Sequence, residues 1–525
     1  MNINFNISKK KLTQYEFENS YISLVGHIEN KDIIYSSLCN DLDNEKFCRL
    51  LKEEIQGFFA IIIKKDDQLY AAVDHIRSHP LFFAKDEFNF YISDSAEWVR
   101  NQVKDLEMDP IAKEEFQLAG YVTGNDTLYP NVKQLQAGEF LVFKNNGYEI
   151  KEYYSFDHLE PKYYDQKDLK DQLEDAADKA IMNLINYAKG RQIVVPLSGG
   201  YDSRLIVTLL KKFKYNNIIT FTYGVNGSKE ATYSKLVADS LGLDWYFIEY
   251  SESIWNEWAQ DEDNIEYQSY CSNLSSIPHL QDCIAVKKLK NKGILNDNAI
   301  FVPGHSGDML AGSHIPDYIH ENYKKIYSKD NLIKHLFEKH YSLKKKSDIQ
   351  AGEYMKKISE IIGSKDYYDA YEFSNQCEKF NWKNRQSKFI CNSVRLYEFY
   401  NYSWWMPLWD KEMVKFFEEL PLELRNHKWY VSYVFDLFEK ESNIRNMKNS
   451  NEHSYFFNLV KKIVTKLSFL NNIVKNIYEK LFFVDQMGWY GQFPNFKIMK
   501  KKGYTYNGLV AYFFIKKLDD RKNRN

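Results

Sequence analysis

Along the first 150 residues, apolar positions come in short β-branched and aromatic runs rather than at helical spacing. Residues 57–63 read Gly-Phe-Phe-Ala-Ile-Ile-Ile, a composition typical of a buried strand. Residues 69–74 and 88–92 are predicted to be its neighbours. Residues 140–143 and 147–153 flank Asn145-Asn146-Gly147 and are predicted to form a hairpin, because Asn-Gly is a preferred hairpin turn. This part of the chain is therefore expected to be mostly strands, with few long helices.

From about residue 170 the pattern alternates between strand and helix. A segment with helical periodicity, 169–188, leads into an apolar run at 193–197, a glycine turn and a helix over 203–212. A strand at 218–223, a helix at 230–241 and a strand at 245–248 follow. Such alternation indicates a parallel sheet with helices on both faces. After about residue 320 the chain is expected to be mostly helical.

The length of the chain divides it into two domains. A chain of 525 residues exceeds the roughly 250–300 residues at which a single core stops growing. The polar stretch 157–168 is the candidate linker, so we predict one domain over 1–160 and another over 165–525. Hydrophobic residues make up 44% and charged residues 27%, which is ordinary for a globular protein.

Charge and cysteine usage exclude several classes of protein. A formal net charge of −2 gives no electrostatic footprint for binding nucleic acid. The six cysteines are scattered and form no C-x-x-C pair, so neither a zinc site nor a redox motif is predicted. The polar N-terminus lacks the apolar run of a secretion signal, and the nearby stretch 58–63 is too short to span a bilayer. We therefore expect a cytoplasmic protein with no transmembrane segment.

The segment with the clearest chemistry is Ser198-Gly199-Gly200-Tyr201-Asp202-Ser203, between a buried strand and a helix. The two glycines let the backbone turn tightly and expose its N–H groups, which attract an anion together with the helix N-terminus. Ser198 and Ser203 add hydroxyl donors. Asp202 would repel a bare phosphate, so its presence implies a bridging magnesium ion. The alternative is a glycine-rich turn that binds no ligand.

This motif resembles that of the PP-loop ATP pyrophosphatases, which cleave ATP between the α and β phosphates. It differs from the Walker loop, since no G-x-x-x-x-G-K-[ST] occurs in the chain. The resemblance implies that AMP is transferred to a substrate and pyrophosphate is released. That chemistry suits a carboxylate, whose own oxygen is a poor leaving group.

Further segments resemble the asparagine synthetase family. Residues 220–224 and 228–230 are similar to the family's second strand, whose end contacts adenine. The similarity implies that Leu197 and Tyr223 line an adenine pocket. Residues 302–312 resemble the S-G-E-G-x-D-E-x-F-x-G loop, which places Gly304 at the nucleotide and makes Asp308 the second magnesium-linked aspartate. Two further signatures of the helical region are matched by Pro407-Leu408-Trp409-Asp410 and Leu420-Pro421.

The N-terminal segments resemble the glutaminase-type domain of the same family. The matches fall in the family's order and lie at 57–60, 74, 80–82, 93, 127–129, 137–139 and 153–154. They imply an N-terminal nucleophile (Ntn) hydrolase-like sandwich. Members that use glutamine need Cys at position 2, where this chain has Asn2, and Cys39 and Cys48 lack the adjacent free α-amine. The domain is thus interpreted as a remnant, the alternative being a misassigned start codon and a glutamine-dependent asparagine synthetase.

The loop around Asp308 departs from the family pattern. Asparagine synthetases have Glu three residues before this aspartate and β-lactam synthetases have Tyr, whereas this chain has His305. A neutral imidazole could deprotonate an attacking amine. The alternative is that His305 only contacts AMP. Met309 replaces an acidic residue, so metal binding would rest on Asp202 and Asp308.

Two more catalytic residues follow from the resemblance. Residues 396–398, Leu-Tyr-Glu, resemble the β-lactam synthetase segment that carries its catalytic glutamate, so Glu398 could orient His305. Alternatively, Glu398 only pairs with Arg395. Lys448 falls where the family has a lysine that steadies the adenylate and the developing charge.

The sequence predicts an α/β and α+β enzyme with a sandwich domain, a PP-loop synthetase domain and a helical C-terminal extension. The implied cofactors are ATP and Mg²⁺, and the implied substrates are a small-molecule carboxylate and ammonia or another amine. A homodimer is left open. The apolar stripe at 459–483 could dock on a membrane surface or pack on its own domain. The rival hypotheses are a non-catalytic ATP-binding scaffold and a PP-loop enzyme that acts on RNA.

Overall fold

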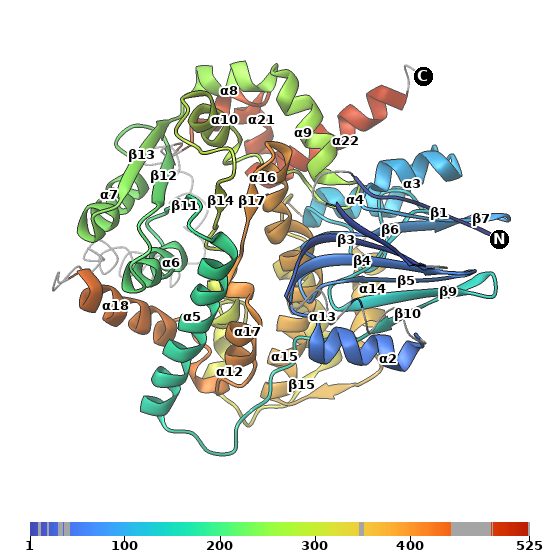
Figure 1. Cartoon of the computed structure of the whole chain (residues 1–525), viewed down its shortest axis with the longest axis horizontal. Helices are drawn as coiled ribbons and strands as arrows, with labels where there is room; N and C mark the ends of the chain where they lie inside the picture. The colour runs from blue at the N-terminus through green and yellow to red at the C-terminus, as the bar shows by residue number, and fades with distance from the viewer. Residues whose placement is uncertain are drawn as a thin grey trace.

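The computed structural model describes residues 1–8, 12–17, 20–29, 35, 42–345, 351–442, 485 and 487–522. Within these ranges an N-terminal β-sandwich packs beside a body built on a parallel sheet (Figure 1). Both predicted architectures are therefore present. No helix in the described ranges is both long and apolar enough to cross a bilayer. Lys448 and the stripe at 459–483 lie outside the described residues.

Two sheets form the sandwich within the described residues, and the spatial order of their strands differs from the order in sequence. The larger sheet runs β10 (Gly147–Glu152), β9 (Glu139–Lys144), β5 (Gln68–Val73), β4 (Gly57–Lys65), β3 (Ser20–Ile28) and β2 (Leu12–Phe17). The smaller sheet runs β1 (Asn2–Asn6), β7 (Asn89–Ser93), β6 (Phe82–Lys85) and β8 (Lys133–Gln134).

Side chains along β4 alternate between the two faces of the larger sheet, which explains why both faces are covered. Ile61 and Ile63 face a core shared with α2 (Asn44–Arg49), whereas Ala60 and Ile62 face a second core shared with the smaller sheet. Because successive side chains of a strand point to opposite faces, one apolar run supplies both cores. The sandwich is thus held by packing on each side of β4.

Most of the predicted strands of this domain are present, with one wrong pairing. The hairpin of β9 and β10 turns through Asn145 and Asn146, whose φ angles are 52° and 60°, with Gly147 paired to Lys144. The segment predicted at 88–92 forms β7, but β7 pairs with β1 and β6 and is no neighbour of β4. Periodicity identifies a strand, and it does not specify the strand's partner.

The second body has a parallel sheet in the order β13 (Asp244–Glu249), β12 (Ile218–Gly224), β11 (Ile193–Pro196), β14 (Ile300–Phe301) and β17 (Ser403–Trp404). Every pairing between these strands is parallel in the described residues. The predicted helices are α5 (Gln166–Ala188), α6 (Tyr201–Lys212) and α7 (Lys229–Leu241). The α5 helix begins before the predicted residue 169, because the Asp165 side chain caps it by accepting from the N–H groups of residues 167 and 168.

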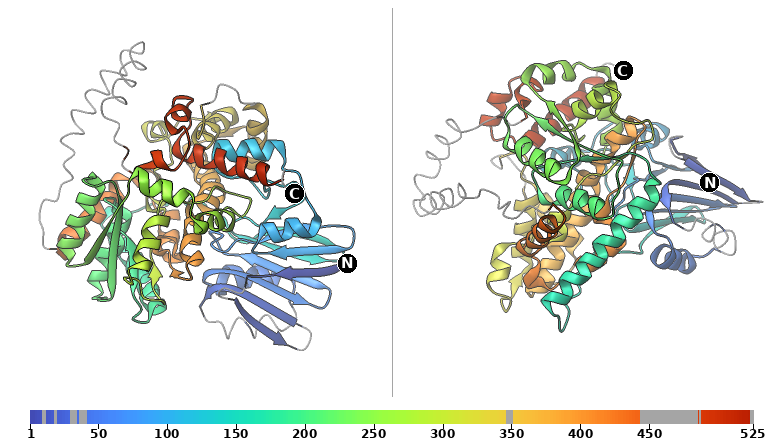
Figure 2. Two further views of the ribbon diagram at one scale, coloured as in Figure 1. Left: turned by 90° about the horizontal axis from the view of Figure 1, so that it is seen from above. Right: turned by 60° about the vertical axis from the view of Figure 1, so that its left-hand side comes forward.

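The chain after residue 320 is mostly helical, as predicted. Its main helices are α13 (Lys329–His340), α14 (Ala351–Ile362), α15 (Ala370–Phe380), α17 (Lys411–Glu418), α18 (Lys428–Ser442) and α22 (Tyr506–Lys522). The last of these returns to the N-terminal part of the chain (Figure 2). There Phe514 stacks on Phe116 of α4 (Pro110–Ala119), with ring centroids 5.8 Å apart, and Asp519 pairs with Lys113.

Direct hydrogen bonds join the two bodies. The Trp382 indole donates to the His75 carbonyl at 2.7 Å, and a ring nitrogen of His75 lies 2.8 Å from the Trp409 carbonyl. The buried Lys388 ammonium donates to the carbonyls of Val122 at 3.0 Å and Gly124 at 2.6 Å. Strand β10 ends at residue 152 and α5 begins at residue 166. The predicted domain boundary at 160–165 lies in the segment between these two elements and stays a prediction.

Candidate active site

The candidate site lies at the carboxyl ends of three neighbouring parallel strands. The loop 198–203 follows β11, Tyr223 is near the end of β12, and the loop 302–308 follows β14. Ligands of open α/β sheets bind at this edge, where the loops after the strands converge. The sheet therefore brings together segments that lie more than a hundred residues apart in the sequence.

The loop after β11 has its own hydrogen-bond network. The Ser198 N–H donates to Ser203 Oγ at 3.1 Å, and the two serine hydroxyls are 3.1 Å apart. The Gly200 N–H donates to Ser198 Oγ at 3.1 Å. No side chain of the described residues caps α6, whose N-terminus points its amide dipoles at the loop. The arrangement presents a preformed turn to an anion.

Arg204 places a buried positive charge beside this loop. Its side chain is 1% exposed, and Nη2 donates to the Gly199 carbonyl at 3.3 Å. Within the described residues, Nε and Nη1 have no hydrogen-bond partner. The guanidinium stacks over the rings of Tyr201, Phe435 and Phe438, and burial lowers its pKa. A nearby anionic ligand would stabilise this desolvated cation.

Asp202 and Asp308 come together through two glycines. The Asp308 N–H donates to Asp202 Oδ2 at 3.3 Å, and the Tyr430 hydroxyl donates to Oδ1 at 3.0 Å. A Cβ on Gly307 would lie 2.5 Å from Asp202 Oδ1, and one on Gly304 would lie 2.6 Å from the backbone nitrogen of residue 203. Only glycine allows the two loops to approach this closely.

The proximity of the two carboxylates raises the pKa of Asp202. Burial, and then the negative charge of Asp308, raise the pKa of Asp202 to about 7. Repulsion of this kind is relieved by a divalent cation. In the described residues no group of three or more His, Cys, Asp or Glu forms a metal cage. Two carboxylates suit Mg²⁺, which usually completes its shell with waters and substrate phosphates, so Asp202 and Asp308 would hold it.

His305 lies in a desolvated pocket beside this pair of loops. One of its ring nitrogens, Nε2, is 2.6 Å from the Ser393 hydroxyl. Burial, and then the nearby His279, lower the pKa of His305 to about 4, while Asp282 opposes the shift. The imidazole is therefore neutral at pH 7 and can act as a weak base.

A buried carboxylate, Asp282, links His305 to the expected adenine pocket. It accepts hydrogen bonds from the hydroxyls of Tyr223 and Tyr397, both at 3.0 Å, and pairs with His279 at 2.7 Å. Despite burial, the charge of His279 and the hydrogen bonds from His279 and Tyr223 lower the pKa of Asp282. The Leu197 side chain is buried in the core, and its N–H donates to the Phe221 carbonyl at 2.8 Å.

Glu398 contacts several polar side chains. Its carboxylate accepts from the Trp404 indole at 2.7 Å and the Tyr270 hydroxyl at 3.1 Å, and it pairs with Arg395 at 2.5 Å. Ser393 is the side chain that contacts His305. The alternative of a pair with Arg395 fits this arrangement, and Glu398 is not part of the proposal for His305.

Several residues of the site have no signal in the sequence. Tyr430 and Ser393 come from distant helical segments and carry no local motif. His279 and Asp282 are three residues apart, a spacing that could have predicted an ion pair. Ser306 adopts φ 72°, an unfavourable backbone conformation that its hydrogen bond to Gln386 at 2.6 Å helps to hold. Strain of this type concentrates at functional loops.

Comparison with known proteins gives two matches in the order of the two bodies. A model described as a glutamine amidotransferase domain matches residues 45–154, and one described as asparagine synthase matches residues 169–258. A curated Methanocaldococcus jannaschii protein, "Putative asparagine synthetase (glutamine-hydrolyzing) 2", is 24% identical over 234 residues. The match covers 42% of this chain and 45% of that relative, so it spans less than half the relative's length.

Two solved structures show weaker similarity. The NH3-dependent NAD synthetase from Campylobacter jejuni is 19% identical, over 29% of this chain and 62% of that chain, with a TM-score of 0.20. The glutamine phosphoribosylpyrophosphate amidotransferase from B. subtilis is 11% identical, over 46% of this chain and 73% of that chain, with a TM-score of 0.17. Similarity at these scores carries no argument about this chain.

The two matches define a class of protein in which an amidotransferase-type domain precedes an asparagine synthase-type domain. Together with the curated relative, they support the asparagine synthetase family for this chain.

Proposed function

We propose that this protein is an ATP-dependent, AMP-forming amide ligase that activates a small-molecule carboxylate. The observation that supports it most is the meeting of Asp202 and Asp308 beside the loop 198–203. Two adjacent carboxylates cost stability unless a bound cation stabilises them, and a phosphate-bridging Mg²⁺ is such a cation. Bound there, Mg²⁺ would neutralise the phosphate charge of ATP.

In the first step, an oxygen of the substrate carboxylate attacks the α-phosphorus of ATP, and the bond to the β-phosphate oxygen breaks. The products are an acyl-adenylate and pyrophosphate. The backbone N–H groups of the loop and the hydroxyls of Ser198 and Ser203 bind the phosphates. Tyr223 lines the adenine pocket, at the end of β12.

In the second step, ammonia or another amine attacks the acyl carbon, and AMP leaves. The attacking nitrogen must lose a proton, and His305 is neutral at pH 7 because its pKa lies at about 4. The hydroxyl of Ser393 orients the imidazole. His305 is therefore proposed as the base of this step.

Exchange of labelled pyrophosphate into ATP tests the proposal. The exchange should depend on one class of carboxylate and should need Mg²⁺ but no amine. Candidate carboxylates are screened in parallel, with the corresponding primary amides as controls that cannot be adenylated. A protein that binds ATP but exchanges no pyrophosphate with any of them would be the non-catalytic scaffold instead.

We further propose that glutamine is a poor nitrogen donor for this chain. Cys48 is the cysteine that the sandwich contains among its described residues. It lies on α2 and packs against the core between α2 and the larger sheet. A thiol within a helix has no adjacent free α-amine, which the glutaminase chemistry requires. Purified protein should form amide product from ammonia and should release little glutamate from glutamine.

Glutamate release is measured with and without ATP and the carboxylate, with Cys48→Ser as the matched control. Release as fast as amide formation would contradict the proposal. Loss of that release in Cys48→Ser would then identify the thiol responsible.

A further inference from the structure

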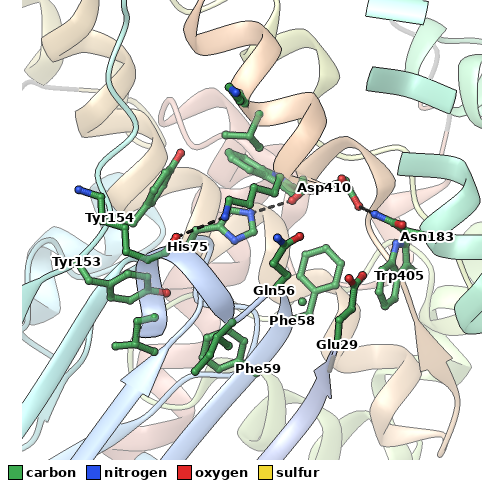
Figure 3. Close-up of a pocket in the computed structure, with 18 of the residues that line it drawn as sticks. Glu29, Gln56, Phe58, Phe59, His75, Tyr153, Tyr154, Asn183, Trp405 and Asp410 are labelled. Atoms are coloured by element: carbon green, nitrogen blue, oxygen red, sulfur yellow. Dashed lines mark hydrogen bonds between the residues drawn. The ribbon is translucent and has the colours of Figure 1, made fainter. Parts of the chain in front are cut away.

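A cavity of about 260 Å³ lies between the sandwich and α17 (Figure 3). In the described part of the chain, its walls come from β4, α5, α17 and the segments around His75, Tyr154 and Trp409. None of the residues of the loop 198–203 lines it. The cavity is therefore separate from the proposed nucleotide site.

Aromatic side chains make up much of this cavity. Phe58, His75, Tyr154, Trp405 and Trp409 line it, and the rings of Phe58 and Trp405 meet edge to face with centroids 5.0 Å apart. Both tryptophans are more than nine-tenths buried, and within the described residues neither indole N–H has a hydrogen-bond partner. Aromatic faces attract cations, so this wall favours a positively charged ligand.

Three carboxylates, Glu29, Asp410 and Glu418, line the same cavity. Asp410 accepts from the Asn183 amide at 3.0 Å, and Glu418 accepts from the Tyr154 hydroxyl at 2.7 Å. Among the described residues, none of the three forms an ion pair. The negative charges are thus held by neutral donors, without a protein cation at salt-bridge distance.

Burial acts on all three carboxyl groups. It raises the pKa of Glu29, Asp410 and Glu418, the last to about 7, and the charge of Asp410 raises that of Glu29 further. The lysines that line the cavity, Lys52, Lys411 and Lys415, are all exposed. The carboxylates are more buried than these ammonium groups, so the interior of the cavity is the acidic part. A cation inside it would offset the cost of burying these charges.

We propose that this cavity binds a small organic ammonium compound. The ammonium lies against the aromatic walls and the carboxylates. A bare metal ion fits less well, because in the described residues these carboxylates form no group that could hold one. An anion is excluded from the interior by the three carboxylates.

Isothermal titration of the full chain with choline tests the site, at pH 8, where Glu418 is ionised since its pKa is about 7. The matched control ligand is 3,3-dimethylbutan-1-ol, which has the same shape without the charge. Choline should bind with a dissociation constant of roughly 1 mM or tighter, and the neutral isostere at least about tenfold more weakly. No ATP is present, so the result is independent of the proposed ligase activity.

Variants of the two carboxylates decide whether the charge acts at this cavity. Asp410→Asn keeps a side chain that can cap α17, and Glu418→Gln keeps an acceptor for Tyr154. Each should weaken choline at least about tenfold and leave the isostere unchanged, since only the charge is lost. Glu419→Gln, an exposed neighbour on the same helix, is the control and should bind choline as the wild type does.

The proposal is overturned if choline shows no saturable binding, if the isostere binds equally well, or if Asp410→Asn and Glu418→Gln both bind choline normally. Thermal melting of every variant excludes misfolding as the cause of lost binding. Because the neutral isostere should still bind the variants, its heat of binding also shows that the cavity is intact in them.

Discussion

Asp202→Asn should abolish carboxylate-dependent pyrophosphate exchange, with a fall of about 10³-fold or more. The substitution keeps the shape and the acceptor for Tyr430 but removes one of the two charges that would hold Mg²⁺ at the phosphates. Charge stabilisation by a metal ion is worth several kcal/mol, and each 1.36 kcal/mol is tenfold in rate. Exchange is measured at saturating ATP and Mg²⁺.

The same variant should be more stable than the wild type at pH 8. In the folded protein the pKa of Asp202 is about 7, above its ordinary value of 3.8, so the folded state binds this proton more tightly than the unfolded chain does. The associated stability is fully present below about pH 4 and is lost as the pH rises through 7. Asn never ionises and escapes this loss, which a rise of about three pKa units sets at roughly 4 kcal/mol.

Thermal unfolding at pH 4 and pH 8 separates the two effects, because the gain should appear at pH 8 only. Asp239→Asn, an exposed aspartate paired with Lys235 on α7, is the control and should retain exchange. Wild-type exchange in Asp202→Asn would remove the basis for the metal assignment. An inactive variant that is also less stable at pH 8 would instead indicate a structural role for Asp202.

His305→Ala should block amide formation while sparing adenylation. The adenylate forms without any amine, so pyrophosphate exchange should continue, whereas amide product should fall on the order of 10²–10⁴-fold, the usual contribution of a general base. Because burial lowers the pKa of His305 to about 4, the imidazole is neutral from about pH 5 upward, and its contribution should not vary with pH in that range. Exchange and product are followed in the same sample.

Equal loss of exchange and amide would mean that His305 only holds AMP, and normal amide formation would exclude both roles. Ser393→Ala tests the positioning contact. The double variant should be little worse than His305→Ala alone, because residues that act as a unit are not additive. Glu398→Gln is the control for the contact between His305 and Ser393, because the Glu398 carboxylate binds Arg395, Trp404 and Tyr270.

The part of the fold that local pattern specifies could be predicted from the sequence. The apolar run at 193–197 and the helix after it appear as β11 and α6, and the Asn145-Asn146-Gly147 turn joins β9 to β10. The partner of β7 could not be predicted, because any strand with one apolar face can pair in either sheet. The helix α3 (Ala96–Val103) was missed, although Ser95 caps it by accepting from the N–H of residue 98.

The site shows the same division between local and long-range information. The loop 198–203 and Asp308 carry recognisable motifs, so their proximity follows once the strands are known to be parallel neighbours. Tyr430, Ser393 and Asp282 reach the site only through the packing of helices far along the chain. The Leu-Tyr-Glu segment is a local motif too, but three residues do not specify which way Glu398 points.

Lys388 couples the stability of the second body to the presence of the sandwich. The ammonium is enclosed in the synthetase body, yet two of its acceptors are the carbonyls of Val122 and Gly124 on the other side of the interface. Without that side, the charge would stand in a nonpolar interior with only Asn384 as an acceptor. Deleting the sandwich is therefore expected to leave this buried side chain short of acceptors and to destabilise the second body.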